Sequence, residues 1–183
     1  LEYQYVAVDL AGGAQWSEAH RARNPTHQVP VLEVEATGRP LRRLVQSMAI
    51  IEWLDEVQPS PPLLPPTADG RARVRALAEH VNSGIQPMQN AIVLKLLREK
   101  VPGWDRSWAQ GAIAGGLAAL ELAVGDGGAG RFCHGDAPGL ADCYLVPQLY
   151  SARRFGVDLA GLPRLLRIEA ACSVLPAFQA AHP

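Results

Sequence analysis

Residues 24–56 read NPTHQVPVLEVEATGRPLRRLVQSMAIIEWLDE, and this stretch decides the fold of the first part of the chain. Apolar and acidic side chains alternate over residues 31–35, which is the period-two pattern of a half-buried strand. A second apolar run, residues 41–45, follows the turn-forming sequence ATGRP at 36–40. The two runs therefore predict a β-hairpin.

A helix is expected directly after the hairpin. Ser47 stands where it can cap a helix N-terminus. Apolar side chains then recur at helical spacing, at Ile50, Ile51, Leu54 and Val57. Strand, strand and helix in this order form half of a thioredoxin-like layer, so we expect an α+β fold here.

Two features of this stretch indicate a binding site. Pro30 stands at the start of the first strand, and a cis Val29–Pro30 bond would turn the Val29 amide and carbonyl towards a peptide-like ligand. The helix that opens at Gln46 and Ser47 offers backbone N–H groups, a hydroxyl and the positive end of a dipole, which suit a carboxylate. A small peptide with a free α-carboxylate fits both. The residues alone also allow an ordinary trans proline and an ordinary helix cap.

Composition and charge argue against nucleic-acid-binding and membrane proteins. The 183 residues carry a formal net charge of −1 and no basic run, so we expect no nucleic-acid partner. No apolar segment is long enough to span a bilayer, and we expect no membrane partner and a cytoplasmic location. Three cysteines without metal-ligand or C-x-x-C spacing are interpreted as reduced structural thiols.

The residues before this stretch give weaker signals. Residues 2–9 alternate like a strand that is buried in part on both faces. Because such a strand would leave the hairpin with a poor edge, we expect a further segment to precede it in the intact protein. Residues 11–26 are polar and contain glycine, and we interpret them as a loop with one helical turn.

A proline-rich segment marks the predicted domain boundary. The sequence QPSPPLLPPTADG at 58–70 holds five of the chain's 15 prolines, a composition that forms neither helix nor strand. We therefore expect an N-terminal domain at 1–59, a linker at 60–69 and an all-helical domain at 70–183.

Helical periodicity dominates the second domain. Residues 71–100 carry a nearly continuous apolar helical face, and Pro87 near its middle predicts a kink. The amides Gln86, Gln89 and Asn90 cluster beside this kink, where they could reach a ligand or could simply be solvated. Further helices are expected at 105–124, from about 140, at 162–172 and at 175–180.

Several strings resemble one family closely. NPxxQVPVL and QSxAIIEWLDE, together with SGIQPMQN at 83–90, ADCYLVPQ at 141–148 and ARRFGVDL at 152–159, are similar to the zeta class of glutathione transferases, the maleylacetoacetate isomerases. The resemblance covers nearly the whole chain. It implies a thioredoxin-like domain followed by a helical domain, a homodimer, and glutathione as cofactor.

The resemblance also implies a set of site residues. Those matched to glutathione binding are Gln15, Val29, Pro30, Gln46, Ser47, Gln86 and Asn90. The family carries a Ser-Ser-Cys-Ser motif between a preceding strand and helix, and no part of this sequence matches it. Asp142 matches a helix-capping aspartate, but Gly139 stands where most relatives have Ser or Thr, which weakens the reciprocal cap.

The implied reaction is the cis–trans isomerisation of maleylacetoacetate or maleylpyruvate, a step of tyrosine and aromatic-acid catabolism. In the family the glutathione thiolate adds to the cis double bond, the adduct rotates about the new single bond, and elimination gives the trans product. Arg154 matches the arginine that anchors the dicarboxylate substrate, because a guanidinium holds a carboxylate through two parallel hydrogen bonds. The residues alone also allow Arg154 to be an ordinary surface arginine, and the adjacent Arg153 could equally be the solvated one.

Other functions remain open from the sequence. A conjugating or dehalogenating transferase would share the fold and the cofactor, and a non-catalytic binding module would share the fold alone. The five histidines are scattered without metal-ligand spacing, so no metal site is expected. The sequence also lacks a G-x-S-x-G motif, a P-loop and a dinucleotide fingerprint.

Overall fold

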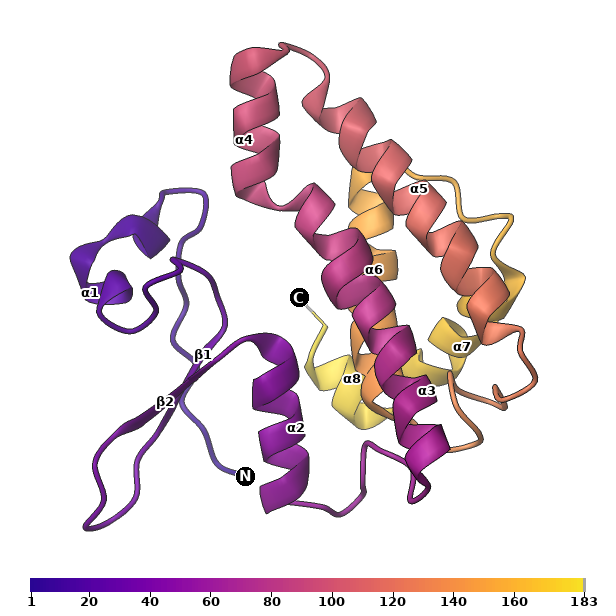
Figure 1. The fold of residues 1–183 in the computed structure, drawn as a ribbon, viewed down its shortest axis with the longest axis horizontal. Coiled ribbons are helices and arrows are strands. Elements are labelled where there is room, and N and C mark those ends of the chain that lie inside the picture. Colours follow the sequence, from indigo (N-terminus) through magenta and orange to yellow (C-terminus); the bar gives the residue numbers. More distant parts are fainter. Residues whose placement is uncertain (183) are drawn as a thin grey trace. The chain divides into compact units, whose positions relative to one another are not determined.

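The structure, a computed structural model, describes residues 1–182. Its backbone contacts divide the chain into two compact units, Leu1–Ser60 and Pro61–Pro183. The first unit combines a small sheet with helices, and the second is built from helices joined by loops (Figure 1). These elements agree with the fold class predicted from the sequence, α+β followed by all-α.

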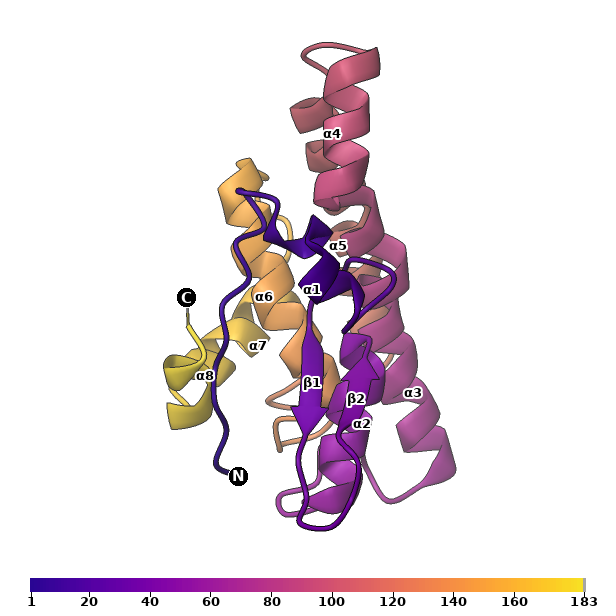
Figure 2. The ribbon, with the colours of Figure 1, turned by 90° about the vertical axis from the view of Figure 1, so that its left-hand side faces the viewer.

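The predicted hairpin is confirmed. Strand β1 (Val31–Val34) pairs antiparallel with β2 (Arg42–Val45), as Figure 2 shows. Glu33 stands opposite Arg43 and accepts a hydrogen bond of 2.7 Å from its Nε, so an ion pair joins the two strands on the exposed face. Gly38 has φ of 72° in the connecting turn, a conformation that favours glycine.

Helix α2 (Ser47–Val57) follows the hairpin, but its cap differs from the prediction. Gln46, with φ of 72° and ψ of 120°, is the N-cap, and Ser47 is the first helical residue. The chain reverses direction at Gln46 to leave β2, so the non-helical backbone conformation of a cap falls there. Ser47 as the cap was therefore wrong by one position, although it still lies in the first turn.

The predicted strand at 2–9 is wrong. No regular structure forms there, and Tyr3 and Tyr5 are 84% and 82% exposed. Alternation tells which face a side chain would take, but a strand also needs a neighbour for its backbone hydrogen bonds, and β1 and β2 pair only with each other within residues 1–182. The expected helical turn in 11–26 is present as η1 (Ala14–Trp16) and α1 (Glu18–Arg21).

The second unit begins with a helical rod that changes type along its length. Helix α3 (Ala68–Glu79) runs into a π-helical turn, η2 (His80–Ile85), and then into a 3₁₀ turn, η3 (Gln86–Gln89). At Asn90 the backbone is extended, with ψ of 142°, and α4 (Ala91–Lys100) starts anew. The predicted kink is therefore a complete break. Pro87, which has no N–H, sits in the first turn of η3 rather than inside a continuous helix.

The remaining helices lie where periodicity predicted them. They are α5 (Asp105–Val124), α6 (Leu140–Phe155), α7 (Pro163–Ser173) and α8 (Pro176–Ala180). Helix α6 packs on α3, α5 and α7 around a core whose fully buried members include Val74, Ile113, Leu117, Leu145, Leu149, Leu165 and Ile168. No helix within residues 1–182 combines the length and apolar character needed to cross a membrane.

Asp142 keeps the structural role expected of it. Its side chain is 1% exposed and accepts hydrogen bonds from the backbone N–H groups of Cys133, at 2.9 Å, and Gly139, at 2.8 Å. The reciprocal half of the cap is missing because Gly139 has no side chain. A Cβ at that position would lie 2.8 Å from the Leu63 carbonyl oxygen, so the close approach of the linker explains the glycine.

Candidate functional site

The backbone of Val29 is presented by a hydrogen-bonded loop. The Gln28 carbonyl accepts from Asn24 Nδ2, at 2.9 Å, and from His20 Nε2, at 3.1 Å. Because a carbonyl only accepts, His20 Nε2 is the donor in this contact. Both clamping side chains are buried, at 1% and 4% exposed. The peptide that precedes Val29 is therefore fixed on two sides.

Val29 itself is available for pairing. The Val29–Pro30 bond is cis, and the Val29 side chain is 41% exposed. Neither its N–H nor its carbonyl makes a hydrogen bond within residues 1–182. An extended peptide ligand could pair with both groups, which is the arrangement predicted from the sequence.

The start of α2 lies next to the same loop. Gln46 Nε2 donates to Gln28 Oε1 at 3.1 Å, which ties the α2 cap to the loop that carries Val29. The N–H groups of the first helical turn have no carbonyl partner within the helix, and the helix dipole adds positive potential there. Gln46 and Ser47 are thus brought together with Val29 and Pro30 at a place suited to a carboxylate.

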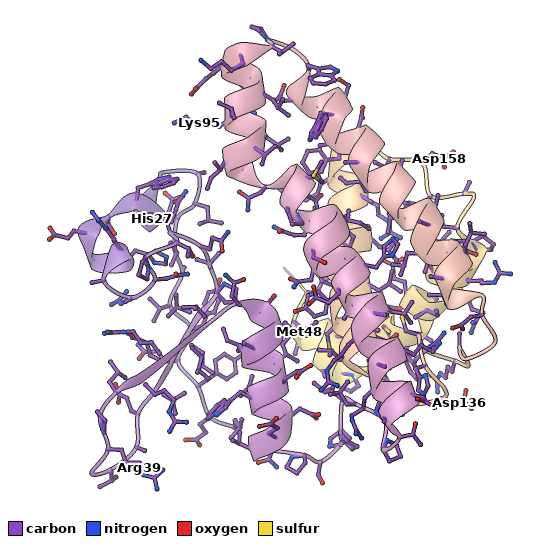
Figure 3. The ribbon with its side chains drawn as sticks, viewed as in Figure 1. His27, Arg39, Met48, Lys95, Asp136 and Asp158 are labelled. Carbon is purple, nitrogen blue, oxygen red and sulfur yellow. The ribbon has the colours of Figure 1, made fainter. Side chains whose placement is uncertain are left out.

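Gln15 reaches this region through η1. His27 Nδ1 lies 3.0 Å from the Gln15 carbonyl, and the His27 ring packs on Trp16 with centroids 4.7 Å apart (Figure 3). The Gln15 side chain is 9% exposed, and its Oε1 has no partner within residues 1–182. A buried acceptor without a donor fits a polar ligand such as the amine or amide of a peptide.

The second unit holds the other predicted amides. Gln86 is exposed, and its side chain makes no hydrogen bond within residues 1–182. Asn90 Oδ1 accepts from the Ile92 N–H at 3.0 Å and so caps α4, which leaves its Nδ2 as the donor for a ligand. Trp108 Nε1 donates to the Met88 carbonyl at 3.0 Å and so holds the turn that lies between Gln86 and Asn90.

The two adjacent arginines at the end of α6 differ in their partners. Arg153 forms two parallel hydrogen bonds of 2.5 Å with the Glu169 carboxylate, which raises the pKa of Arg153. Arg154 is exposed and has no hydrogen bond or ion pair within residues 1–182. Of the two, only Arg154 has its guanidinium available to a carboxylate, and its role as a substrate anchor stays a prediction.

The cysteines cannot serve as nucleophiles at neutral pH. All three are free thiols, and Cys133 and Cys172 are buried. Burial and the nearby Asp142 carboxylate raise the pKa of Cys143 to about 11 and of Cys172 to about 12, and raise the pKa of Cys133 well above its usual range. The three thiols of residues 1–182 therefore stay protonated at neutral pH.

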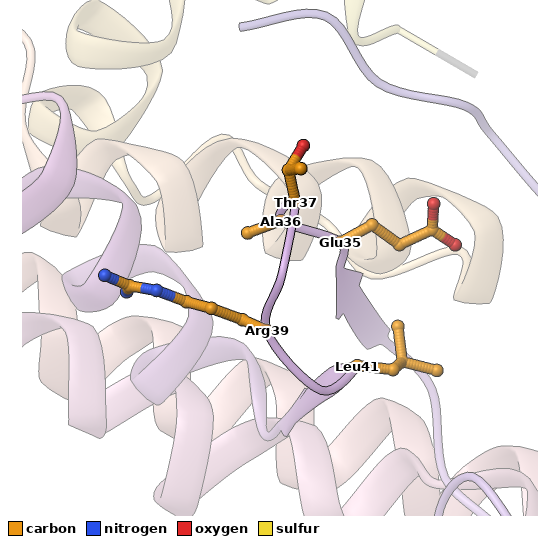
Figure 4. Close-up of a pocket in the computed structure, with 5 residues that line it drawn as sticks. All are labelled: Glu35, Ala36, Thr37, Arg39 and Leu41. Carbon is orange, nitrogen blue, oxygen red and sulfur yellow. The ribbon is translucent and has the colours of Figure 1, made fainter.

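A shallow hollow of 470 Å³ lies at the tip of the hairpin, away from these residues. It is lined by Glu35, Ala36, Thr37, Arg39 and Leu41. In the close-up the charged side chains of Glu35 and Arg39 extend away from each other, so no convergent set of polar groups forms (Figure 4). The hollow is not a candidate site.

Neither Asn24 nor His20 was predicted from the sequence as a residue that supports the site. Asn-Pro is a turn signal, so Asn24 could have been identified as a residue that bonds its own loop. His20 gave no local signal, because its partner lies eight residues away and is a backbone carbonyl.

Comparisons with known proteins cover both units. The family description "Glutathione S-transferase, C-terminal domain" matches residues 42–178, and "Glutathione S-transferase, N-terminal domain" matches residues 1–56. A maleylpyruvate isomerase of Ralstonia sp. is 46% identical over 192 residues, which cover 100% of this chain and 86% of the relative.

Solved structures agree with these matches. The maleylacetoacetate isomerase of Anaeromyxobacter dehalogenans 2CP-1 with bound glutathione has a TM-score of 0.92 and 69% identity, covering 100% of this chain and 84% of that one. The maleylacetoacetate isomerase of Methylobacterium extorquens AM1 with bound malonate and glutathione has a TM-score of 0.93 and 34% identity, covering 100% and 86%.

The raised thiol pKa values predict slow labelling of the native protein. At about pH 8 a chromogenic aromatic disulfide should react with the folded chain far more slowly than with free cysteine, and with three thiols after unfolding. Stability should fall as the pH rises from about 8.5 towards 11, because the unfolded chain then loses thiol protons that the folded chain keeps. Rapid labelling of a native thiol would contradict the buried, protonated assignment.

Proposed function

The chain belongs to the glutathione S-transferase family, and we propose that it is a glutathione-dependent cis–trans isomerase of maleylacetoacetate or maleylpyruvate. The observation that carries this proposal is the full-length likeness to isomerases of that substrate class. The unpaired Arg154 beside the engaged Arg153 supports it, because a dicarboxylate substrate needs a free guanidinium.

We assign glutathione to a set of residues in both units. In the first unit they are Val29 and Pro30 through the main chain, Gln46 and Ser47 at the α2 N-terminus, and Gln15 through its side chain. In the second unit they are Gln86 and Asn90. The unpaired Val29 backbone and the buried Gln15 Oε1 fit a tripeptide, and the α2 N-terminus fits its α-carboxylate.

Bound glutathione would supply the thiolate that adds to the cis double bond and leaves again after rotation. The chain's own contribution is to bind and align. Arg154 would hold a substrate carboxylate through two hydrogen bonds and stabilise the negative charge that grows on the adjoining carbonyl during addition. The cysteines stay protonated, so they do not compete as nucleophiles.

The proposed roles of the domains, the location and the metabolic context follow from these assignments. Residues 1–59 act as the glutathione domain, 60–69 as the linker and 70–183 as the substrate domain. Three free thiols and the use of reduced glutathione are typical of the cytoplasm. The substrate class places the reaction in the catabolism of tyrosine or related aromatic acids.

We also propose that the protein is a homodimer. Helix α4 has no buried residue, and large apolar side chains along it and after it are about half exposed, namely Ile92, Leu96, Val101 and Trp104. Apolar surface of this kind is typical of a face that a partner covers.

Ser47→Ala should weaken glutathione binding. Loss of a hydrogen bond to a carboxylate costs about 1.5–3 kcal/mol, which is roughly a 10- to 150-fold rise in Kd. Calorimetry measures this directly, with Thr37→Ala on the hairpin tip as a control that also loses a hydroxyl. Equal affinity in Ser47→Ala and the parent would remove Ser47 from the site.

Arg154→Lys should lower isomerase turnover by about tenfold or more while changing glutathione affinity little. Lysine keeps the charge but loses the planar fork, so the carboxylate is attracted without being aligned. Steady-state kinetics with maleylacetoacetate and maleylpyruvate at saturating glutathione test this, and Arg153→Lys is the matched control. A larger defect in Arg153→Lys would move the role to that residue. An inactive parent that conjugates electrophiles would favour the transferase alternative.

Light scattering should give the mass of a dimer at micromolar concentration. Leu96→Gln should shift the protein towards monomer, because it places an amide in the apolar face of α4. Lys95→Gln is the control, since Lys95 extends from the same helix with 77% of its side chain exposed (Figure 3). A monomeric parent would overturn the proposed homodimer.

A further inference from the structure

The short turn η3 is held in place by side chains from two other helices. Gln89 Nε2 donates to Gln148 Oε1 at 2.7 Å, and Ser151 Oγ donates to Gln89 Oε1 at 3.2 Å. Both partners of Gln89 belong to α6. From α5, Trp108 Nε1 donates to the Met88 carbonyl at 3.0 Å. Four residues of 3₁₀ helix have few internal bonds, so these external bonds fix the position of η3.

The turn that precedes η3 is held in the same way. His80 Nε2 lies 3.1 Å from the Gly116 carbonyl of α5. A Cβ on Gly116 would overlap the Ile85 side chain, so α5 approaches η2 closely at this point. The π-helical turn therefore delivers Gln86 at a defined rotation around the rod, and π-helical turns of this kind recur at functional sites.

Gln148 is an unusual residue for a helix core. It is 3% exposed, and its Nε2 has no partner within residues 1–182. A buried donor without an acceptor lowers stability, and an apolar side chain of the same length would avoid that cost. Packing alone therefore does not explain a glutamine at this position. The one bond that its amide makes is the short bond to Gln89.

The same bonds connect the two parts of the site in the second unit. Ser151 lies one helical turn after Gln148 and one turn before Arg154 along α6. Gln89 lies between Gln86 and Asn90 along the chain. The bonds of Gln89 to Gln148 and Ser151 thus fix the proposed glutathione amides relative to the helix that carries the proposed substrate anchor.

We propose that Gln148, acting through Gln89 together with Ser151, is a positioning residue that sets the distance between the amides of Gln86 and Asn90 and the guanidinium of Arg154. This inference rests on the proposed function, because it concerns the alignment of glutathione with the substrate. Gln148 itself need touch neither ligand. Its role is to keep η3 in register with the last turns of α6.

The test compares stability with catalysis in Gln148→Met, Gln89→Met and Ser151→Ala. Methionine keeps the length and flexibility of glutamine and removes the amide. Thermal unfolding of Gln148→Met should occur close to the parent's temperature, because the loss of an unpaired buried donor offsets the loss of the acceptor for Gln89 Nε2. Its kcat/KM for the maleyl substrate should nevertheless fall by roughly three- to tenfold. The double variant Gln89→Met with Gln148→Met should be no worse than either single variant, because both remove the same bond.

Gln179→Met is the control, since it removes another hydrogen-bonded glutamine amide of the second unit, whose Nε2 donates to the Ser173 carbonyl, but Gln179 lies on α8. It should leave kcat/KM at the parent's value. Unchanged kinetics in both Gln148→Met and Ser151→Ala would overturn the proposal, as would a loss of activity that only follows a loss of thermal stability. If Gln148→Met does not fold, Gln89→Met and Ser151→Ala decide the question.

Failure of this inference is distinguishable from failure of the proposed function. A parent without isomerase activity refutes the isomerase assignment. The glutathione Kd of the same variants, measured by calorimetry, then still decides whether Gln148 and Gln89 position the amides of η3. An unchanged Kd across the series in that case overturns the positioning role as well.

Discussion

The break of the helical rod near Pro87 is the feature on which the proposed site of the second unit depends. Pro87 lacks the N–H that a helix interior needs, and the rod that begins with α3 ends and restarts within a few residues of it, whereas α6 continues past Pro147. The structure uses this break in two ways. It exposes Gln86 at the end of the π-helical turn, and it lets Asn90 cap a new helix. In an uninterrupted helix, Gln86 and Asn90 would both occupy ordinary surface positions of the helix.

In the first unit, side-chain hydrogen bonds hold the backbone that is proposed to bind the ligand. The backbone of Val29 must stay unpaired and yet fixed if it is to bind another peptide. The buried Asn24 and His20 achieve this by holding the preceding carbonyl, that of Gln28, from two directions. In both units, side chains from neighbouring segments hold the backbone that carries groups proposed to meet glutathione, Val29 in the first unit and Gln86 in the second.

Much of this arrangement could be predicted from local pattern. Period-two alternation located the hairpin, helical periodicity located the helices of the second unit, and Pro87 located the break. Local pattern gave a wrong prediction where secondary structure depends on hydrogen bonds to another segment of the chain. Residues 2–9 alternate correctly but form no strand, because hydrogen bonds to a neighbouring strand, and not side-chain alternation, make a strand.

Residue roles in the site needed the structure for the same reason. The sequence presents Arg153 and Arg154 as equal neighbours, and only the position of Glu169 on another helix separates them. Likewise, Gln89 and Gln148 are 59 residues apart, so their 2.7 Å bond has no signature in spacing. Contacts between residues so far apart in the sequence depend on how the helices pack, and composition and periodicity do not determine that packing.

The distribution of charge and thiols explains what this protein contributes to a reaction. Its cysteines are held protonated by burial, and one of two adjacent arginines is neutralised by a glutamate. Among the residues proposed for the site, what remains available is a set of amides, a helix N-terminus and the guanidinium of Arg154. None of these groups breaks or forms a bond to carbon. In the proposed reaction they would bind a thiol peptide and an anion and hold both in place, so the barrier would be lowered by alignment and by stabilising the charge that develops on the substrate.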